Sequence, residues 1–169
     1  MQHRTSLCHG CSGVFVLILV CLGPVSSAEG AAKNVISQLD WVIQNDTVMG
    51  GRSRAQLAWN AQQHLQWSGV LSLENNGGFV SIRSQNQVFD WSAYDGLEIV
   101  VEGFGRDIQV TTQRKDMMVR AGGYRAMVST EAVGKTVVYI PFSAFALKRF
   151  GRPISGPPLQ TGLRSIASV

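Results

Sequence analysis

The chain has 169 residues, of which 45% are hydrophobic, and its formal net charge is +4 at pH 7. This length supplies one hydrophobic core of ordinary size. The cysteines Cys8, Cys11 and Cys21 all precede Glu29, and the chain after that point contains a single histidine, His64. The composition therefore disfavours disulfides, most zinc or non-haem iron centres, and nucleophilic catalysis in the main part of the chain.

Basic residues gather in the C-terminal part of the chain. Residues 106–169 contain ten basic and three acidic residues, whereas residues 29–105 contain four basic and eight acidic ones. The cations are spread over several predicted strands and loops and are not interleaved with stacking aromatics, which disfavours nucleic-acid binding. We interpret them as a solvated basic face, with an acidic partner surface or anionic membrane lipid as the alternative.

The first element in chain order is an apolar run from Val14 to Leu22, which follows a weakly basic start at Arg4. Such a run, followed by a proline and small residues, is typical of a signal peptide and is too short to span a bilayer comfortably. We predict cleavage after Ala28, export to the periplasm or outside the cell, and no integral membrane segment after cleavage. Lipoprotein anchoring at Cys21 and mitochondrial targeting are less favoured, because a bulky residue precedes Cys21 and the leader has one arginine.

Three parts are expected along the chain: a signal peptide at residues 1–28, a lead-in at residues 29–40, and one domain at residues 41–169. Ala31 to Leu39 is the segment of the lead-in that could be helical. No internal repeat or low-complexity tract interrupts the domain, so it is treated as a single folding unit.

The domain is predicted to consist of short strands. Leu65, Trp67, Leu71 and Leu73 occupy alternate positions, which places them on one face of a strand, and Gly69 marks a point where a side chain is excluded or the strand bulges. Many short strands with Gly-rich turns favour a sandwich or jelly roll. Further strands are expected at residues 79–84, 97–102, 108–114, 124–129 and 136–140.

The most unusual loop is N-D-T-V-M-G-G-R-S, from Asn45 to Ser53. Its Asp, Thr and Ser side chains could close local backbone hydrogen bonds, which is the favoured interpretation. Alternatively, the loop presents Asp46, Arg52 and backbone amides to a partner. The candidate binding residues in this loop are Asp46, Thr47, Gly50, Gly51, Arg52 and Ser53.

A second candidate loop is Asn75-Asn76-Gly77-Gly78, in which each residue tolerates positive φ. If the turn requires positive φ at Gly77, Gly77→Val should destabilise the domain by about 1–3 kcal/mol. The candidate binding residues here are Asn75, Asn76, Gly77 and Gly78.

Catalysis is not predicted. Asp90, Asp95, Glu98 and Glu102 come nearest to the paired carboxylates of a glycosidase. Glu98 and Glu102 share a strand face with Val100, whereas the apolar residues between them point the other way, which indicates a solvated outer face. We therefore expect no catalytic residue, no metal site and no cofactor.

Four sequence blocks resemble, in the same order, the complex I intermediate-associated protein 30 family, also called the NADH:ubiquinone oxidoreductase intermediate-associated family. The likeness extends from about Trp41 to Ile166. The blocks are N-D-T-V-M-G-G-R-S at 45–53, L-S-L-E-N-N-G-G-F-V-S-I-R at 71–83, Y-D-G-L-E-I at 94–99 and I-P-F-S-A-F at 140–145.

The resemblance implies a galactose-binding-like β-sandwich of jelly-roll type. The family's mitochondrial members are assembly chaperones for respiratory complex I, and no catalytic set can be carried over from them. The chain stops at Ser165 to Val169, where the family's pattern would continue into closing strands. We expect a truncated product or an incomplete sheet edge, that is, a sandwich missing its C-terminal strands.

The predicted function is that of a non-enzymatic protein-binding domain of assembly-chaperone type, which uses the two candidate loops at one end of the sandwich. The alternative is an exported carbohydrate-binding module with an exposed aromatic platform such as Trp59 or Trp91. Tryptophan in a sandwich more often packs in the core or at its rim. The partner is accordingly a protein or a glycan.

Overall fold

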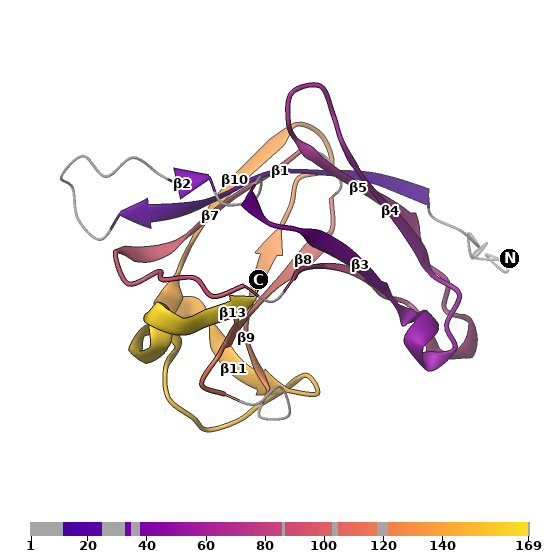
Figure 1. The fold of residues 1–169 in the computed structure, drawn as a ribbon. Coiled ribbons are helices and arrows are strands. Elements are labelled where there is room, and N and C mark those ends of the chain that lie inside the picture. Colours follow the sequence, from indigo (N-terminus) through magenta and orange to yellow (C-terminus); the bar gives the residue numbers. More distant parts are fainter. Residues whose placement is uncertain are drawn as a thin grey trace, which may run out of the picture.

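The computed structural model describes residues 12–24, 33–34, 38–85, 87–102, 105–117 and 122–168, and these form strands joined by turns and short 3-10 helices (Figure 1). The all-β prediction is confirmed. In the described part of the chain, no helix has the length and apolarity needed to cross a bilayer. The strands are β1 (Ser12–Pro24), β2 (Lys33–Asn34), β3 (Trp41–Asn45), β4 (Arg54–Trp59), β5 (Leu65–Val70), β6 (Val80–Ser84), β7 (Tyr94–Glu102), β8 (Asp107–Arg114), β9 (Gly123–Ser129), β10 (Lys135–Pro141), β11 (Ala146–Arg149), β12 (Arg152–Pro153) and β13 (Ile166–Ser168).

The strands of the described residues form three antiparallel sheets. The largest has the order β10-β7-β1-β5-β4 with β2 on β1, the second has the order β12-β11-β9-β8-β13, and β3 pairs with β6. In the described part of the chain they are connected by the 3-10 helices η2 (Asp46–Met49), η3 (Glu74–Asn76), η5 (Phe142–Ala144) and η6 (Leu159–Ser165). The arrangement is consistent with a β-sandwich.

Alternating residues of β7 and β9 supply much of the core. Leu97, Ile99 and Val101 on β7 are buried, and they belong to the same cluster as Tyr124, Ala126 and Val128 on β9. This two-residue period is what a strand with one core-facing side produces. The opposite face of β7 is less exposed than predicted, since Val100 is also buried and Glu98 is half-buried.

The predicted strands at residues 79–84, 97–102, 108–114, 124–129 and 136–140 are confirmed as β6 to β10, within a few residues at each end. The prediction for the β5 region was wrong beyond Val70. Leu73, expected on the core face, is 84% exposed. Beyond the end of β5, the Ser72 amide donates to Ser53 Oγ at 3.0 Å.

The apolar segment predicted as the core of a signal peptide forms β1 in this structure. It runs antiparallel to β5, from Ser12↔Val70 to Leu17↔Leu65, and antiparallel to β7, from Val16↔Glu102 to Pro24↔Tyr94. Thus β1 lies between β5 and β7 in the larger sheet. Export and removal of the leader remain predictions.

The cleavage point after Ala28 lies outside the described residues, as does most of the segment from Ala31 to Leu39 that could have been helical. The helix prediction fails at Lys33–Asn34, which pair with Leu22 and Cys21 as β2. Backbone groups here are paired with a neighbouring strand, which replaces the local pairing of a helix.

Candidate functional site

The two candidate loops meet at one end of the molecule. Figure 1 shows η2, which follows β3, beside the turn that contains η3, which follows β5. The Asn75 side chain donates to the Gly50 carbonyl at 3.0 Å, and Arg52 pairs with Glu74 at 2.8 Å. We call residues 46–53 and 72–79 together the loop end.

The carboxylate of Asp46 holds the loop end together. Asp46 is fully buried, at 0% exposure, and accepts hydrogen bonds from both the amide and the hydroxyl of Ser53. From the second loop it accepts the Gly78 amide at 2.7 Å and the Phe79 amide at 3.4 Å. One carboxylate therefore satisfies donors from segments 7 to 33 residues away along the chain.

These contacts also set the ionisation of Asp46. Burial opposes the charged form, but the hydrogen bonds from Ser53, Gly78 and Phe79 outweigh it and lower the pKa of Asp46 below 3.8. The carboxylate is therefore ionised at neutral pH and serves as the acceptor for its ring of donors.

Two glycines are required because the backbone passes against this carboxylate. A Cβ on Gly51 would lie 2.4 Å from Asp46 Cγ, and one on Gly77 would lie 2.5 Å from Asp46 Oδ2. The left-handed positions are others: Gly50 has φ 85° and Gly78 has φ 121°, and Asn75 and Asn76 are also left-handed. The prediction that the turn needs Gly77 for a positive φ was wrong, because its φ is −71°. A side chain is excluded at this position because a Cβ would collide with neighbouring atoms.

The predicted site residues divide into internal and surface groups. Asp46, Gly51 and Ser53 are buried, so the carboxylate of Asp46 is internal to the loop end and does not present its oxygens at the surface. Gly77 and Gly78 are partly exposed. The exposed candidates are Thr47, Gly50, Arg52, Asn75 and Asn76.

The loop end also exposes large apolar side chains, which the sequence reasoning missed. Val48 and Met49 are 68% and 63% exposed on η2, and Leu73 is exposed on the neighbouring loop. Leu73 Cδ2 would touch a Cβ on Gly78, so this side chain lies over the clamped turn. We call Val48, Met49 and Leu73 the apolar tip. The sequence does carry an indication of this exposure, because Val48 and Met49 are two adjacent large apolar residues within an otherwise polar loop.

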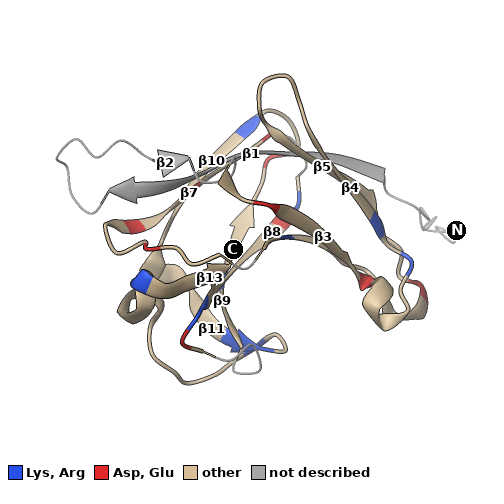
Figure 2. Ribbon diagram, in the orientation of Figure 1, with Lys and Arg blue, Asp and Glu red and all other residues tan. Residues whose placement is uncertain are grey.

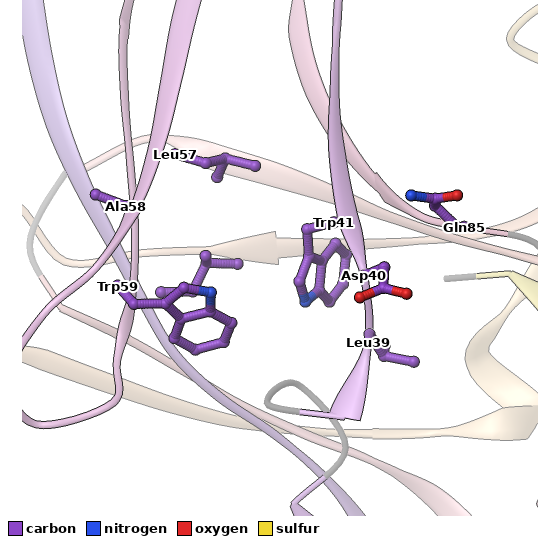
Figure 3. Close-up of a pocket in the computed structure, with 8 residues that line it drawn as sticks. Leu39, Asp40, Trp41, Leu57, Ala58, Trp59 and Gln85 are labelled. Atoms are coloured by element: carbon purple, nitrogen blue, oxygen red, sulfur yellow. The ribbon is translucent and has the colours of Figure 1, made fainter.

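The two tryptophans considered as sugar platforms have different surroundings. Trp91 is 2% exposed and stacks on Phe142 with a centroid distance of 5.7 Å, so it is a core residue and not a platform. Trp59 is 43% exposed. It lines a pocket of about 340 Å³ whose walls also carry Trp41, Asp40 and Gln85 (Figure 3).

The carboxylates considered for catalysis have separate local partners. Asp90 accepts the amide and the hydroxyl of Ser92, and these hydrogen bonds lower the pKa of Asp90. Asp95 accepts the Tyr139 hydroxyl, and burial together with this bond raises the pKa of Tyr139 to about 12. Among the described residues, no three His, Cys, Asp or Glu side chains are grouped so as to hold a metal ion.

His64 lies in the turn between β4 and β5, where its amide donates to the Asn60 side chain at 2.9 Å. The neighbouring Gln63 has φ 59°, and its amide donates to the Asn60 carbonyl at 3.0 Å. These contacts give His64 a structural position in a hairpin turn.

The sequence was compared with curated proteins and with models of protein families. No curated protein matches the chain. The family model described as Complex I intermediate-associated protein 30 matches residues 31–167, which include the Asp46 clamp, both loops and the apolar tip. The match spans most of the chain, and the chain therefore belongs to the Complex I intermediate-associated protein 30 family.

Proposed function

We propose that this chain is a non-enzymatic protein-binding domain that contacts its partner through the apolar tip. The observation that carries the proposal is the exposure of Val48, Met49 and Leu73 together on loops fixed by one buried carboxylate. Membership of a family associated with complex I assembly intermediates supports a role of the assembly-chaperone kind.

The tip has the physical properties of a protein contact. Removing large apolar side chains from water when a partner binds lowers the free energy, and methionine is among the residues enriched in protein interfaces. Arg52 and Glu74 form an exposed ion pair beside the tip. Such a pair contributes little to stability but supplies a polar rim that can select a partner.

The clamp matters because a rigid contact surface loses less conformational entropy on binding. Val48 and Met49 lie on the short helix that begins at Asp46, and the second loop is bound to the same carboxylate through Gly78. The relative positions of the two parts of the tip are thus set before a partner arrives.

The test compares capture of a partner by matched variants of the full-length protein. Wild type, the double variant Met49→Ser/Leu73→Ser and the control Val133→Ser are each cross-linked in an extract of the source organism. Val133 is also a highly exposed apolar residue, but it lies in the turn between β9 and β10. We expect the tip variant to lose a protein that wild type and control both retain, and equal recovery by all three would refute the assignment.

The compartment forms part of the same proposal. The composition of residues 1–28 supports export, so the partner would be a periplasmic or secreted protein, or an exported segment of a membrane protein. Intact mass of the protein recovered outside the cytoplasm is expected to correspond to a chain starting at Glu29. Recovery of the full-length chain only, and from the cytoplasm, would contradict this.

A second candidate function is carbohydrate binding at the pocket beside Trp59. Figure 3 shows the rings of Trp59 and Trp41 directed toward the same space, and Asp40 also lines this pocket. Aromatic faces with nearby polar groups suit the apolar and hydroxyl faces of a sugar. A glycan array followed by thermal shift with each hit tests it. A sugar that stabilises wild type but not Trp59→Ala supports this function, and the absence of any such sugar rejects it.

A further inference from the structure

The hairpin formed by β11 and β12 has an unusual tip. Its turn is Phe150-Gly151, and both residues are left-handed, with φ of 47° and 77°. Asparagine and glycine are the residues that two-residue hairpins with this backbone prefer. A bulky aromatic residue at positive φ carries a steric cost. Phe150 is nevertheless 93% exposed, so packing within the protein does not account for it.

The tip is surrounded by cations. Arg149 and Arg152 are paired across the two strands, which places like charges opposite each other, an arrangement that by itself destabilises a hairpin. Lys148 precedes them, and residues 146–153 include no acidic residue. Within the described chain, none of these three cations forms an ion pair. We call residues 146–153 the basic hairpin.

A fourth cation lies on the next strand. Arg125 on β9 is opposite Ala146 in the register, so it shares a sheet face with Lys148 two residues further on. Asp116, in the turn that follows β8, is bonded to Arg114. Figure 2 shows the blue segments of β11 gathered at one end of the molecule.

We propose that the basic hairpin docks on an anionic lipid surface, with Phe150 inserted between headgroups and the cations Lys148, Arg149 and Arg152 at the headgroup level. A single projecting aromatic residue in a ring of cations fits a soft, negatively charged interface. Its apolar ring enters the acyl boundary while the charges remain among the phosphates. A single-stranded nucleic acid would call for several stacking aromatics, whereas the hairpin has one.

This inference is independent of the partner contact at the apolar tip, since it rests on a different element. It accounts for two features that destabilise the folded hairpin, the left-handed backbone of Phe150 and the facing arginines Arg149 and Arg152. The exposed ring of Phe150 and the charges of the arginines would both favour binding to a charged bilayer. Membrane association would also bring the protein to the surface on which an assembly factor for a membrane complex meets its partner.

The test is co-sedimentation of the full-length protein with vesicles of phosphatidylcholine alone or with added phosphatidylglycerol. We expect binding that requires the anionic lipid and weakens as NaCl is raised. Replacing each arginine removes about 1 kcal/mol of attraction to an anionic surface, so Arg149→Gln/Arg152→Gln should weaken binding roughly 25-fold. The control Arg83→Gln, on β6, should bind as wild type does, within roughly fivefold.

Phe150→Asn separates binding from folding. Asparagine tolerates the left-handed backbone, so this variant should melt at the same temperature as wild type or higher. It should nevertheless bind anionic vesicles roughly tenfold more weakly, because the inserted ring is gone. Wild-type binding that is absent or independent of anionic lipid, or hairpin variants that bind as wild type does, would overturn the proposal. The proposal would also be overturned if the basic hairpin bound an acidic protein and did not bind the anionic vesicles.

Discussion

Replacing Gly77 by alanine tests the steric account of the loop end. Gly77 has φ −71°, which alanine adopts without strain. The added Cβ, however, would lie 2.5 Å from Asp46 Oδ2, 2.7 Å from the Ser72 carbonyl oxygen and 3.0 Å from the Glu74 carbonyl oxygen. Ordinary carbon–oxygen contacts are longer, so the backbone or the buried carboxylate must move, and the bond from Gly78 would be strained.

The magnitude follows from two opposing effects. Overpacking of a tight site costs about 1–3 kcal/mol. Replacing glycine also lowers the conformational entropy of the unfolded chain, which stabilises the folded protein by about 0.4–1 kcal/mol. The midpoints of these two ranges give a net destabilisation of Gly77→Ala of about 1–2 kcal/mol. For a chain of this size the melting temperature should fall by about 2–8 °C.

The assay is thermal and urea unfolding of wild type, Gly77→Ala, Gly77→Asn and Gly134→Asn. Gly134 has φ 87° and no atom within 4 Å of a Cβ, so asparagine should be tolerated there. If positive φ were the requirement at Gly77, asparagine would be milder than alanine. The steric account predicts that asparagine is at least as damaging. A Gly77→Ala protein as stable as wild type would refute the reasoning.

Three further predictions concern the rest of the fold. Because the pKa of Asp46 is lowered on folding, its ionised form contributes stability above its ordinary pKa of 3.8, and this is lost as the pH falls through the lower folded value. The unfolding free energy of wild type should accordingly fall more steeply below about pH 4 than that of Asp46→Asn, and parallel curves would contradict the clamp. Arg114, which donates to Asp116, to the Pro158 carbonyl and to Thr161 Oγ1, ties η6 to β8; Arg114→Met should cost about 1–3 kcal/mol in urea unfolding, and no change would show that these bonds add nothing. A chain that starts at Glu29 lacks β1 and should melt below the full chain, and a peptide of residues 12–24 should raise its melting temperature more than a scrambled peptide does; equal melting of both chains would contradict the contribution of β1.

The strands that sequence reasoning located correctly are those whose signal is local. In β7 and β9, apolar residues alternate and turn residues bound the run, so the pattern alone defines the strand. The end of β5 was not predictable in this way. Leu71 and Leu73 continue the alternation, but β5 ends at Val70, and the next segment bonds through Ser72 to Ser53, 19 residues away in the sequence.

The candidate loops show the same limit. Their unusual composition marked both of them, yet the reason for the composition is a carboxylate whose donors lie up to 33 residues away. The sequence could not distinguish a buried Asp46 from an exposed one, nor a crowded Gly77 from a left-handed one. It likewise could not separate Trp59 from Trp91, because exposure depends on packing between distant segments.

The leader illustrates an ambiguity of composition. An unbroken apolar run of this length is typical of a signal peptide and equally of a strand buried inside a sheet. The structure has the run as β1 between β5 and β7. If the leader is removed as proposed, the mature chain lacks β1, and the experiments on a chain starting at Glu29 compare that form with the full chain.

Hydrogen exchange at the loop end tests most directly whether Asp46 organises the contact surface. The account predicts slow exchange at the amides of Ser53 and Gly78 in wild type, and simultaneous loss of protection at both in Asp46→Ala, with the amides of β9 unaffected. Fast exchange of these two amides in wild type, or protection that survives in Asp46→Ala, would contradict it.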